Sequence, residues 1–179
     1  MNRSYTEEIL ERIKNEFKSE NLLALPMLKG ISVSLRVGRF KEDLKSVESA
    51  KEDILKITGQ APSERFSKKP ISSFKLKEGD LVGLLVTLRG QKMWQFLEKL
   101  TKVVLPSVRD FQGLKSQGID KGGNLSIGFR DQTAFPEIDP NKIDKLRGLG
   151  VTLTVARLGN EDEAKKFYEC LGFKFNKFR

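Results

Sequence analysis

The sequence predicts an α+β fold: a two-layer sandwich in which a mostly antiparallel sheet carries helices on one face and leaves the other face open. Segments in which apolar and polar residues alternate, typical of half-buried strands, occur between segments of helical periodicity. These segments do not follow the regular βαβ order that favours a parallel sheet. Because 179 residues suit one domain, we expect a single domain over residues 1–179, with basic loops at 61–80 and 107–123.

In the N-terminal part, a helix, a strand and a second helix are expected in that order. Residues 5–17 place apolar side chains on one helical face. Ile31–Val37 alternates strictly, which predicts a half-buried strand. Residues 41–58 return to helical spacing, and Gly59 stands where a helix C-terminus commonly has glycine. The next residues, 61–80, carry few strand signals and are expected to form a basic loop.

The C-terminal part is expected to contain three more strands and two more helices. The same two periodicities identify them, and the expected strands are 81–88, 124–130 and 151–157, with helices at 91–104 and 161–171. Pro106 and Gly172 would end the two helices. Residues 107–123 show neither periodicity and are expected to form the second basic loop.

The positive charge is concentrated in the middle of the chain. The protein has 33 basic and 24 acidic residues, a net charge of +9. Residues 61–130 hold 13 basic and 6 acidic residues, whereas residues 1–60 hold 11 and 10 and residues 131–179 hold 9 and 8. A basic excess gathered in one region favours a polyanionic partner, nucleic acid above all, over a generally basic surface.

Several classes of function are excluded or disfavoured by composition. The chain has no histidine and one cysteine, Cys170, so histidine-based catalysis, zinc fingers and an intrachain disulfide are excluded. Its apolar stretches are much shorter than a membrane span, and its N-terminus does not resemble a signal peptide. The acidic residues Asp131, Glu137, Asp139 and Asp144 lack an accompanying nucleophile or base. These observations disfavour catalysis, and we expect a cytoplasmic protein without cofactor, metal or membrane contact.

The polar faces of the predicted strands resemble one another. Opposite their apolar residues they carry small, hydroxyl-bearing or cationic side chains: Ser32, Ser34, Arg36, Gly83, Thr87, Arg89, Asn124, Ser126, Gly128, Arg130, Thr152 and Thr154. Hydroxyls, amides and arginines bind ribose and phosphate oxygens. Because few aromatic residues lie on this face, it suits recognition of RNA shape better than base stacking. A solvated sheet face could have a similar composition, but the central charge excess favours RNA.

Two other functions remain open from the residues alone. Residues 164–173 resemble a segment of GCN5-related acetyltransferases, and residues 145–150 loosely resemble the pyrophosphate loop of that family, which would imply an acyl-CoA-dependent N-acetyltransferase. In those enzymes a helix follows the loop, whereas here the strand 151–157 is expected. The third possibility is a non-ribosomal RNA chaperone, which would not sediment with large ribosomal subunits.

Long strings of residues carry a more specific resemblance. They are TGQAP at 58–62, KKPISSFKLKEGD at 68–80, VTLRGQKMWQFLEKL at 86–100, LPSVRDFQGL at 105–114, GGNLSIGFRDQTAFPEID at 122–139 and Arg147-Gly148. With these strings the chain resembles the bacterial-type large-ribosomal-subunit protein L-five family, which binds 5S rRNA. The resemblance implies a non-enzymatic, ribosome-bound protein of the central protuberance. Its implied partners are 5S rRNA, 23S rRNA with neighbouring large-subunit proteins, P-site tRNA, and a small-subunit head protein of the S-thirteen family.

The resemblance also assigns residues to these partners. Gln60, Phe74 and Thr87 match rRNA-contact positions of the family, and with the open sheet face they give the expected rRNA site: Ser32, Ser34, Arg36, Gln60, Phe74, Thr87, Arg89, Asn124, Ser126 and Arg130. The expected tRNA contacts are Lys68, Lys69, Ser72, Lys75 and Lys77. The expected contacts of the intersubunit bridge are Arg109, Lys115 and Lys121. Where the family usually has Asn-Met-Gly, this chain has Ser34-Leu35-Arg36, and Arg36 could bind a phosphate in compensation.

Overall fold

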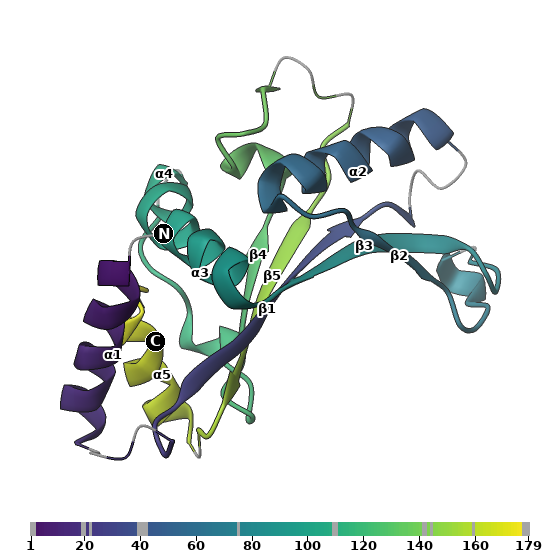
Figure 1. The fold of residues 1–179 in the computed structure, drawn as a ribbon. Coiled ribbons are helices and arrows are strands. Elements are labelled where there is room, and N and C mark those ends of the chain that lie inside the picture. Colours follow the sequence, from purple (N-terminus) through teal and green to yellow (C-terminus); the bar gives the residue numbers. More distant parts are fainter. Residues whose placement is uncertain are drawn as a thin grey trace. The chain divides into compact units, whose positions relative to one another are not determined.

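A computed structural model describes residues 3–18, 21, 23–38, 43–74, 76–108, 111–140, 143, 145–158 and 160–176. Its five strands form one antiparallel sheet in the order β2-β3-β1-β5-β4 (Figure 1). The strands are β1 (Met27–Arg36), β2 (Ser63–Phe66), β3 (Leu81–Leu88), β4 (Leu125–Phe129) and β5 (Leu149–Ala156). The helices are α1 (Arg3–Phe17), α2 (Leu44–Thr58), α3 (Gly90–Lys99), α4 (Leu105–Ser107) and α5 (Glu161–Cys170), with a π-helical turn at Leu100–Val104. The predicted α+β class is confirmed.

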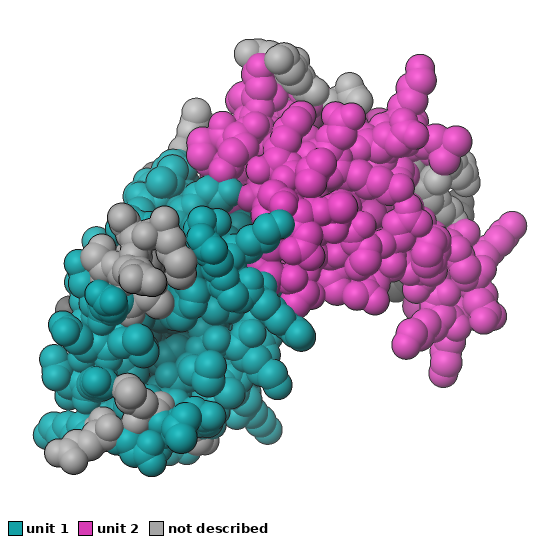
Figure 2. All heavy atoms as spheres, in the orientation of Figure 1, with its two compact units in different colours: residues 1–31, 89–127, 152–179 teal, residues 32–88, 128–151 magenta. Residues whose placement is uncertain are grey.

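The chain divides into two compact units, which Figure 2 distinguishes by colour. Unit 1 comprises residues 1–31, 89–127 and 152–179, and unit 2 comprises residues 32–88 and 128–151. Each unit has buried apolar side chains of its own. The single domain expected from the sequence stays a prediction.

In unit 1, helices α1 and α5 pack against each other. Ile13 of α1 and Phe167 of α5 are almost completely buried, as expected for the apolar faces of amphipathic helices. The hydroxyl of Tyr168 donates a hydrogen bond of 2.8 Å to the carbonyl of Gly123, and its ring meets Phe173 edge to face. Burial raises the pKa of Tyr168. The aromatic residues of α5 are therefore part of the core.

In unit 2, helix α2 packs against β3. Ala50 and Ile54 on its inner face are fully buried, as are Leu84 and Leu88 of the strand. The helix ends at Gly59, whose φ of 64° lies in the left-handed region and whose N–H donates to the carbonyl of Leu55 at 2.8 Å. Glycine adopts this conformation without a steric penalty, so the predicted C-terminal glycine is confirmed.

We call residues 63–80 the hairpin arm; the expectation of a loop over 61–80 is wrong for Ser63–Phe66, which form strand β2. Strand β2 pairs antiparallel with β3, with a bulge between Arg65 and Phe66. Farther along the arm, Ile71 and Leu76 exchange two backbone hydrogen bonds of 2.9 and 3.1 Å. All four side chains of β2 are exposed. The strand forms through backbone pairing at the sheet edge, so its sequence carries no alternation of buried and exposed residues.

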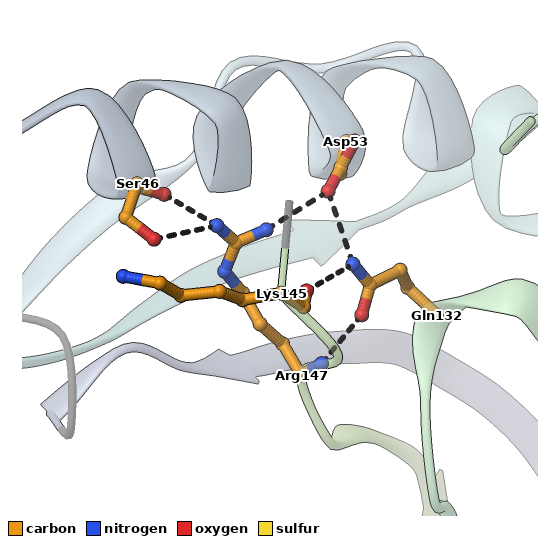
Figure 3. A network of polar contacts seen from close by, with 5 residues as sticks. All are labelled: Ser46, Asp53, Gln132, Lys145 and Arg147. Atoms are coloured by element: carbon orange, nitrogen blue, oxygen red, sulfur yellow. Dashed lines mark hydrogen bonds and ion pairs between the residues drawn. The ribbon is translucent and has the colours of Figure 1, made fainter. Parts of the chain in front are cut away.

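A buried polar network fixes the segment before β5 to helix α2 within unit 2 (Figure 3). The side chain of Arg147 is inaccessible to solvent and lies 3.3 Å from the carboxylate of Asp53. Its guanidinium also donates to the carbonyl and the hydroxyl of Ser46, at 2.8 and 2.9 Å. Gln132 accepts from the Arg147 N–H at 2.6 Å and donates to the Lys145 carbonyl at 3.0 Å. Burial raises the pKa of Asp53, and the positive charge of Arg147 opposes that rise.

We predict that Arg147→Met lowers the free energy of unfolding by about 3 kcal/mol, because it leaves Asp53 without its cation. Urea denaturation at neutral pH measures the loss. Since the pKa of folded Asp53 is raised, its neutral form is favoured in acid; the penalty should therefore shrink as the pH falls through that pKa.

Lys145→Met is the control for Arg147→Met, because Lys145 pairs with Asp43 at 2.8 Å on the surface and exposed pairs contribute little. Equal losses from Arg147→Met and Lys145→Met would contradict the importance of the buried network.

Candidate nucleic-acid interface

The polar face of the sheet is accessible along the strands that were predicted to carry it. In β1, Val33 and Leu35 are fully buried, whereas the alternate residues Ser34 and Arg36 are exposed. Strand β5 alternates buried and half-buried side chains throughout. None of the residues predicted on the polar face is buried: Ser32, Ser34, Arg36, Gly83, Thr87, Arg89, Asn124, Ser126, Gly128, Arg130, Thr152 and Thr154. Gly150 and the apolar Leu85, both half-buried, alternate with the buried residues of their strands in the same way. The side chains of this face are available to a partner.

In unit 2, the polar face combines hydroxyls with cations that form no ion pair with any described residue. The hydroxyl of Ser34 donates to the carbonyl of Gly150 at 3.3 Å. Within the described parts of the chain, the exposed guanidinium groups of Arg36 and Arg130 make neither an ion pair nor a hydrogen bond. The exposed hydroxyl of Thr87 likewise makes no hydrogen bond to a described residue. Arg36, Arg130 and Thr87 therefore leave donors for ribose or phosphate oxygens, and the Ser34 hydroxyl oxygen can still accept a hydrogen bond.

Close backbone approach explains the glycine in the middle of β3. A Cβ atom at Gly83 would lie 2.9 Å from the carbonyl oxygen of Leu35 in β1, closer than non-bonded atoms allow. Glycine is therefore needed at this position for the two strands to pair.

A further cation, Arg65, belongs to this face and was not among the expected site residues. It pairs with Gly83 in the β2–β3 register, and cross-strand partners point to the same face of a sheet. Arg65 is exposed and has no ion pair among the described residues. Sequence reasoning missed it because β2 was expected to be a loop, in which no face can be assigned.

In unit 1, the predicted residues are Arg89, Asn124 and Ser126. The hydroxyls of Ser126 and Thr152 lie 3.2 Å apart. Arg89 is exposed at the N-cap position of α3 and makes no capping hydrogen bond with its side chain. The structure thus leaves both Ser126 and Arg89 accessible.

The side chain of Asn124 makes hydrogen bonds within the protein. Its side-chain oxygen accepts a hydrogen bond from Val155 N–H at 3.1 Å, and its side-chain nitrogen donates to the Asp120 carboxylate at 2.9 Å. The hydrogen bond from the Asn124 side chain lowers the pKa of Asp120. The amide of Asn124 therefore has a structural task besides its predicted RNA contact.

Gln60 and the arm lie in unit 2. Gln60 is half-buried directly after α2, where its N–H donates to the Thr58 hydroxyl at 3.3 Å. Phe74 ends the short helical turn Ser72–Phe74, and its side chain lies outside the described residues. The predicted tRNA contacts Lys68, Lys69, Ser72 and Lys77 are exposed on the arm, whereas Lys75 lies outside the described residues.

The predicted bridge residues Lys115 and Lys121 are exposed in unit 1, and Arg109 lies outside the described residues. Residues 111–123 have ordered backbone contacts. The N–H of Leu114 donates to the carbonyl of Lys174 at 2.8 Å, and its carbonyl accepts from Asn176 at 2.9 Å. Lys121 lies in the tight turn that Asp120 closes with the N–H of Gly123, at 2.9 Å.

Two other features were searched for in the described parts of the chain. No described helix has both the length and the hydropathy needed to cross a bilayer. The described acidic residues and Cys170 nowhere gather in a group of three that could ligate a metal. Of the acidic residues considered from the sequence, Asp131 caps a turn by accepting from the Thr133 N–H at 3.1 Å, and Asp144 lies outside the description.

Together these features define a class of protein: a basic α+β protein with one accessible, polar and cationic sheet face. Comparison with known families gives a narrower result. The family model described as "Ribosomal protein L5" matches residues 21–77, and the model for the C-terminus of the same ribosomal family matches residues 81–175. The chain belongs to the ribosomal protein L5 family, a family of structural proteins and not of enzymes.

Similar proteins come from bacteria of several genera. The "Large ribosomal subunit protein uL5" of Corynebacterium diphtheriae is 43% identical over 173 residues, covering 97% of this chain and 92% of that protein. The protein of the same name from Halothermothrix orenii is 40% identical over 172 residues, covering 96% of each chain. That of Francisella philomiragia is 37% identical over 171 residues, covering 96% of this chain and 95% of the relative. The resemblance seen in the sequence strings is confirmed.

We predict that Asn124→Ala lowers the free energy of unfolding by about 1 kcal/mol, because the Val155 N–H loses its acceptor. It should also move the pKa of Asp120 up towards its ordinary value of 3.8. Since Asn124 stabilises ionised Asp120, that part of the loss should be present above pH 4 and vanish as the pH falls through the lowered pKa. Urea denaturation across this pH range, with NMR titration of Asp120, measures both effects; a pH-independent loss would contradict the coupling.

Proposed function

We propose that the chain is a ribosome-bound structural constituent of the large subunit and that its polar sheet face binds 5S rRNA. One observation carries the proposal beyond family membership: in unit 2 the exposed arginines Arg36, Arg65 and Arg130 lack acidic partners among the described residues. Unpaired guanidinium groups can replace the counterions of RNA phosphates, which is the main source of affinity in such complexes.

The hydroxyl groups complement these charges. Thr87 and Ser34 stand on the same accessible face. The Thr87 hydroxyl can donate to a phosphate oxygen, whereas the Ser34 hydroxyl, which donates to Gly150, can accept from a ribose 2′-OH. Because the strands hold the backbone in place, these side chains are positioned before RNA arrives and little conformational entropy is lost on binding. The mechanism is complementarity of shape and charge, with no chemical step.

The hairpin arm is proposed to reach P-site tRNA. Lys68 and Lys69 are exposed in its turn region, and Ser72 and Lys77 follow nearby along the chain. Backbone hydrogen bonds close the base of the turn: Ser67 N–H donates to Asp80 at 2.8 Å, and Gly79 N–H donates to Ser67 at 3.0 Å. A closed hairpin can present lysines to a distant phosphate group with less loss of entropy than a free loop. Lys75 is proposed to contribute to the same contact.

The third proposed contact is the intersubunit bridge to a small-subunit head protein of the S-thirteen family. Lys115 and Lys121 are its exposed candidates in unit 1, together with Arg109. Neighbouring large-subunit proteins and 23S rRNA are proposed as further partners within the particle.

The acetyltransferase interpretation is not supported. Strand β5 begins at Leu149, within the candidate phosphate loop of residues 145–150, so no helix N-terminus follows that loop. Phe167 and Tyr168 of the similar C-terminal segment are fully buried core residues. Nothing specific in the structure favours a free RNA chaperone over a subunit constituent.

We predict that the affinity for purified 5S rRNA falls steeply with salt, and that Arg36→Gln makes the slope of log affinity against log salt shallower by about 1. Filter binding at several salt concentrations measures the slope. Lys45→Gln, on the first turn of α2 away from the polar face, removes the same charge and should leave the slope unchanged. A salt-independent affinity would contradict binding through phosphates.

We predict that Thr87→Glu weakens 5S rRNA binding by about tenfold or more, because it places a negative charge against phosphate. Thr87 is exposed, so the melting temperature should change little. Gln95→Glu, on the exposed side of α3, adds the same charge elsewhere and is the control. Equal affinities of wild type and Thr87→Glu would remove Thr87 from the interface.

A further inference from the structure

Gly128 stands near the end of β4 at a position where the fold gains nothing from glycine. It is exposed on the polar face, between Ser126 and Arg130 along the chain. Glycine in a strand loses more conformational entropy on folding than other residues and offers no side chain for packing. The presence of glycine in a strand therefore has one of three usual reasons: a backbone conformation that other residues avoid, crowding by a neighbouring atom, or the close approach of a ligand.

Backbone geometry does not supply the reason. Gly128 is absent from the glycines with positive φ, which include Gly59, Gly113 and Gly123. Its backbone is ordinary strand, which any residue can adopt.

Crowding does not supply it either. A Cβ atom built at Gly128 meets no atom within 4 Å. The other glycines of the polar face differ: a Cβ at Gly83 would lie 2.9 Å from the Leu35 carbonyl oxygen, and one at Gly150 would lie 2.9 Å from the Ser34 hydroxyl. A backbone atom thus explains Gly83 within the fold and a side-chain hydroxyl lies close to Gly150, whereas Gly128 has no close neighbour.

The surroundings of Gly128 indicate the kind of ligand. Arg130, two residues farther along in the same unit, is exposed and unpaired among the described residues. A guanidinium beside bare main chain matches a sugar–phosphate backbone, whose ribose can then reach van der Waals contact with the strand.

We propose that Gly128 is a contact residue of the RNA interface, where the absence of a side chain lets the sugar–phosphate backbone of rRNA contact β4 while Arg130 binds a neighbouring phosphate. This inference rests on the proposed function, because it assigns a new residue and a new mode of contact to the same face. It predicts opposite effects of one substitution on folding and on binding, which a structural role for Gly128 would not produce.

The test is Gly128→Val, with melting temperature and 5S rRNA affinity at fixed salt as the two readouts. Valine suits an exposed strand position and has free space here, so the melting temperature should stay equal or rise. The affinity should fall by about tenfold or more, because the side chain holds the RNA backbone away from its contacts. Gly128→Ala should give a smaller loss. Ser49→Val, on α2 outside the polar face, enlarges a side chain without changing charge and should bind as wild type does.

The outcomes separate the two proposals. If wild type binds 5S rRNA and Gly128→Val binds equally tightly, the assignment of Gly128 is overturned and the proposed function stands. A fall in melting temperature that accompanies and accounts for the loss of affinity would also overturn it. If wild type itself fails to bind 5S rRNA, the proposed function fails, and the assignment fails with it.

Discussion

The buried charge of Arg147 constrains the part of the protein that carries most of the polar face. A guanidinium removed from water is tolerated only when carboxylate and carbonyl groups surround it, and Asp53 and Ser46 of α2 supply them. The side-chain oxygen of Gln132 accepts a hydrogen bond from the backbone N–H of the same arginine. The next residue, Gly148, accepts the backbone hydrogen bond of Arg36 at 3.3 Å. The buried network therefore sets the position of the backbone that carries Arg36, an exposed arginine of the proposed interface.

Because side chains alternate along each strand, one face of the sheet packs in the core and the other remains accessible. Residues such as Leu35 and Leu84 bury completely and supply the hydrophobic stabilisation. The intervening positions are exposed or half-buried and, apart from Leu81 and Leu85, bury little apolar surface, so they can carry serine, threonine, glycine and arginine. Gly83 shows the limit of this freedom, because its place next to the Leu35 carbonyl admits no side chain. Binding chemistry could thus be placed on one face without weakening the core.

The sequence predicted elements whose burial is encoded locally and missed those that depend on distant residues. The strand 81–88 was predicted with the bounds that β3 has, because buried and more accessible residues alternate along it from Leu84 to Leu88. Strand β2 was missed because all its side chains are exposed, and with it the place of Arg65. No local pattern marks Arg147 for burial, since its partner Asp53 is 94 residues away in the sequence. For the same reason, the internal hydrogen bonds of Asn124 could not be foreseen, as Val155 is 31 residues distant.

The arginines of unit 2 show why net charge alone is a weak guide to an RNA interface. Arg147 is as cationic as Arg36, yet its charge is enclosed by Asp53 and by oxygen acceptors, and it has no surface through which a phosphate could reach it. Arg36, Arg65 and Arg130 are exposed, and no described carboxylate neutralises them. A phosphate that binds such a group displaces only water and mobile ions, whereas one that approached Arg147 would have to break a buried ion pair. The electrostatic attraction for RNA therefore depends on which cations lack a neutralising carboxylate. In unit 2, Arg147 is buried in an ion pair, whereas Arg36, Arg65 and Arg130 are exposed without one among the described residues.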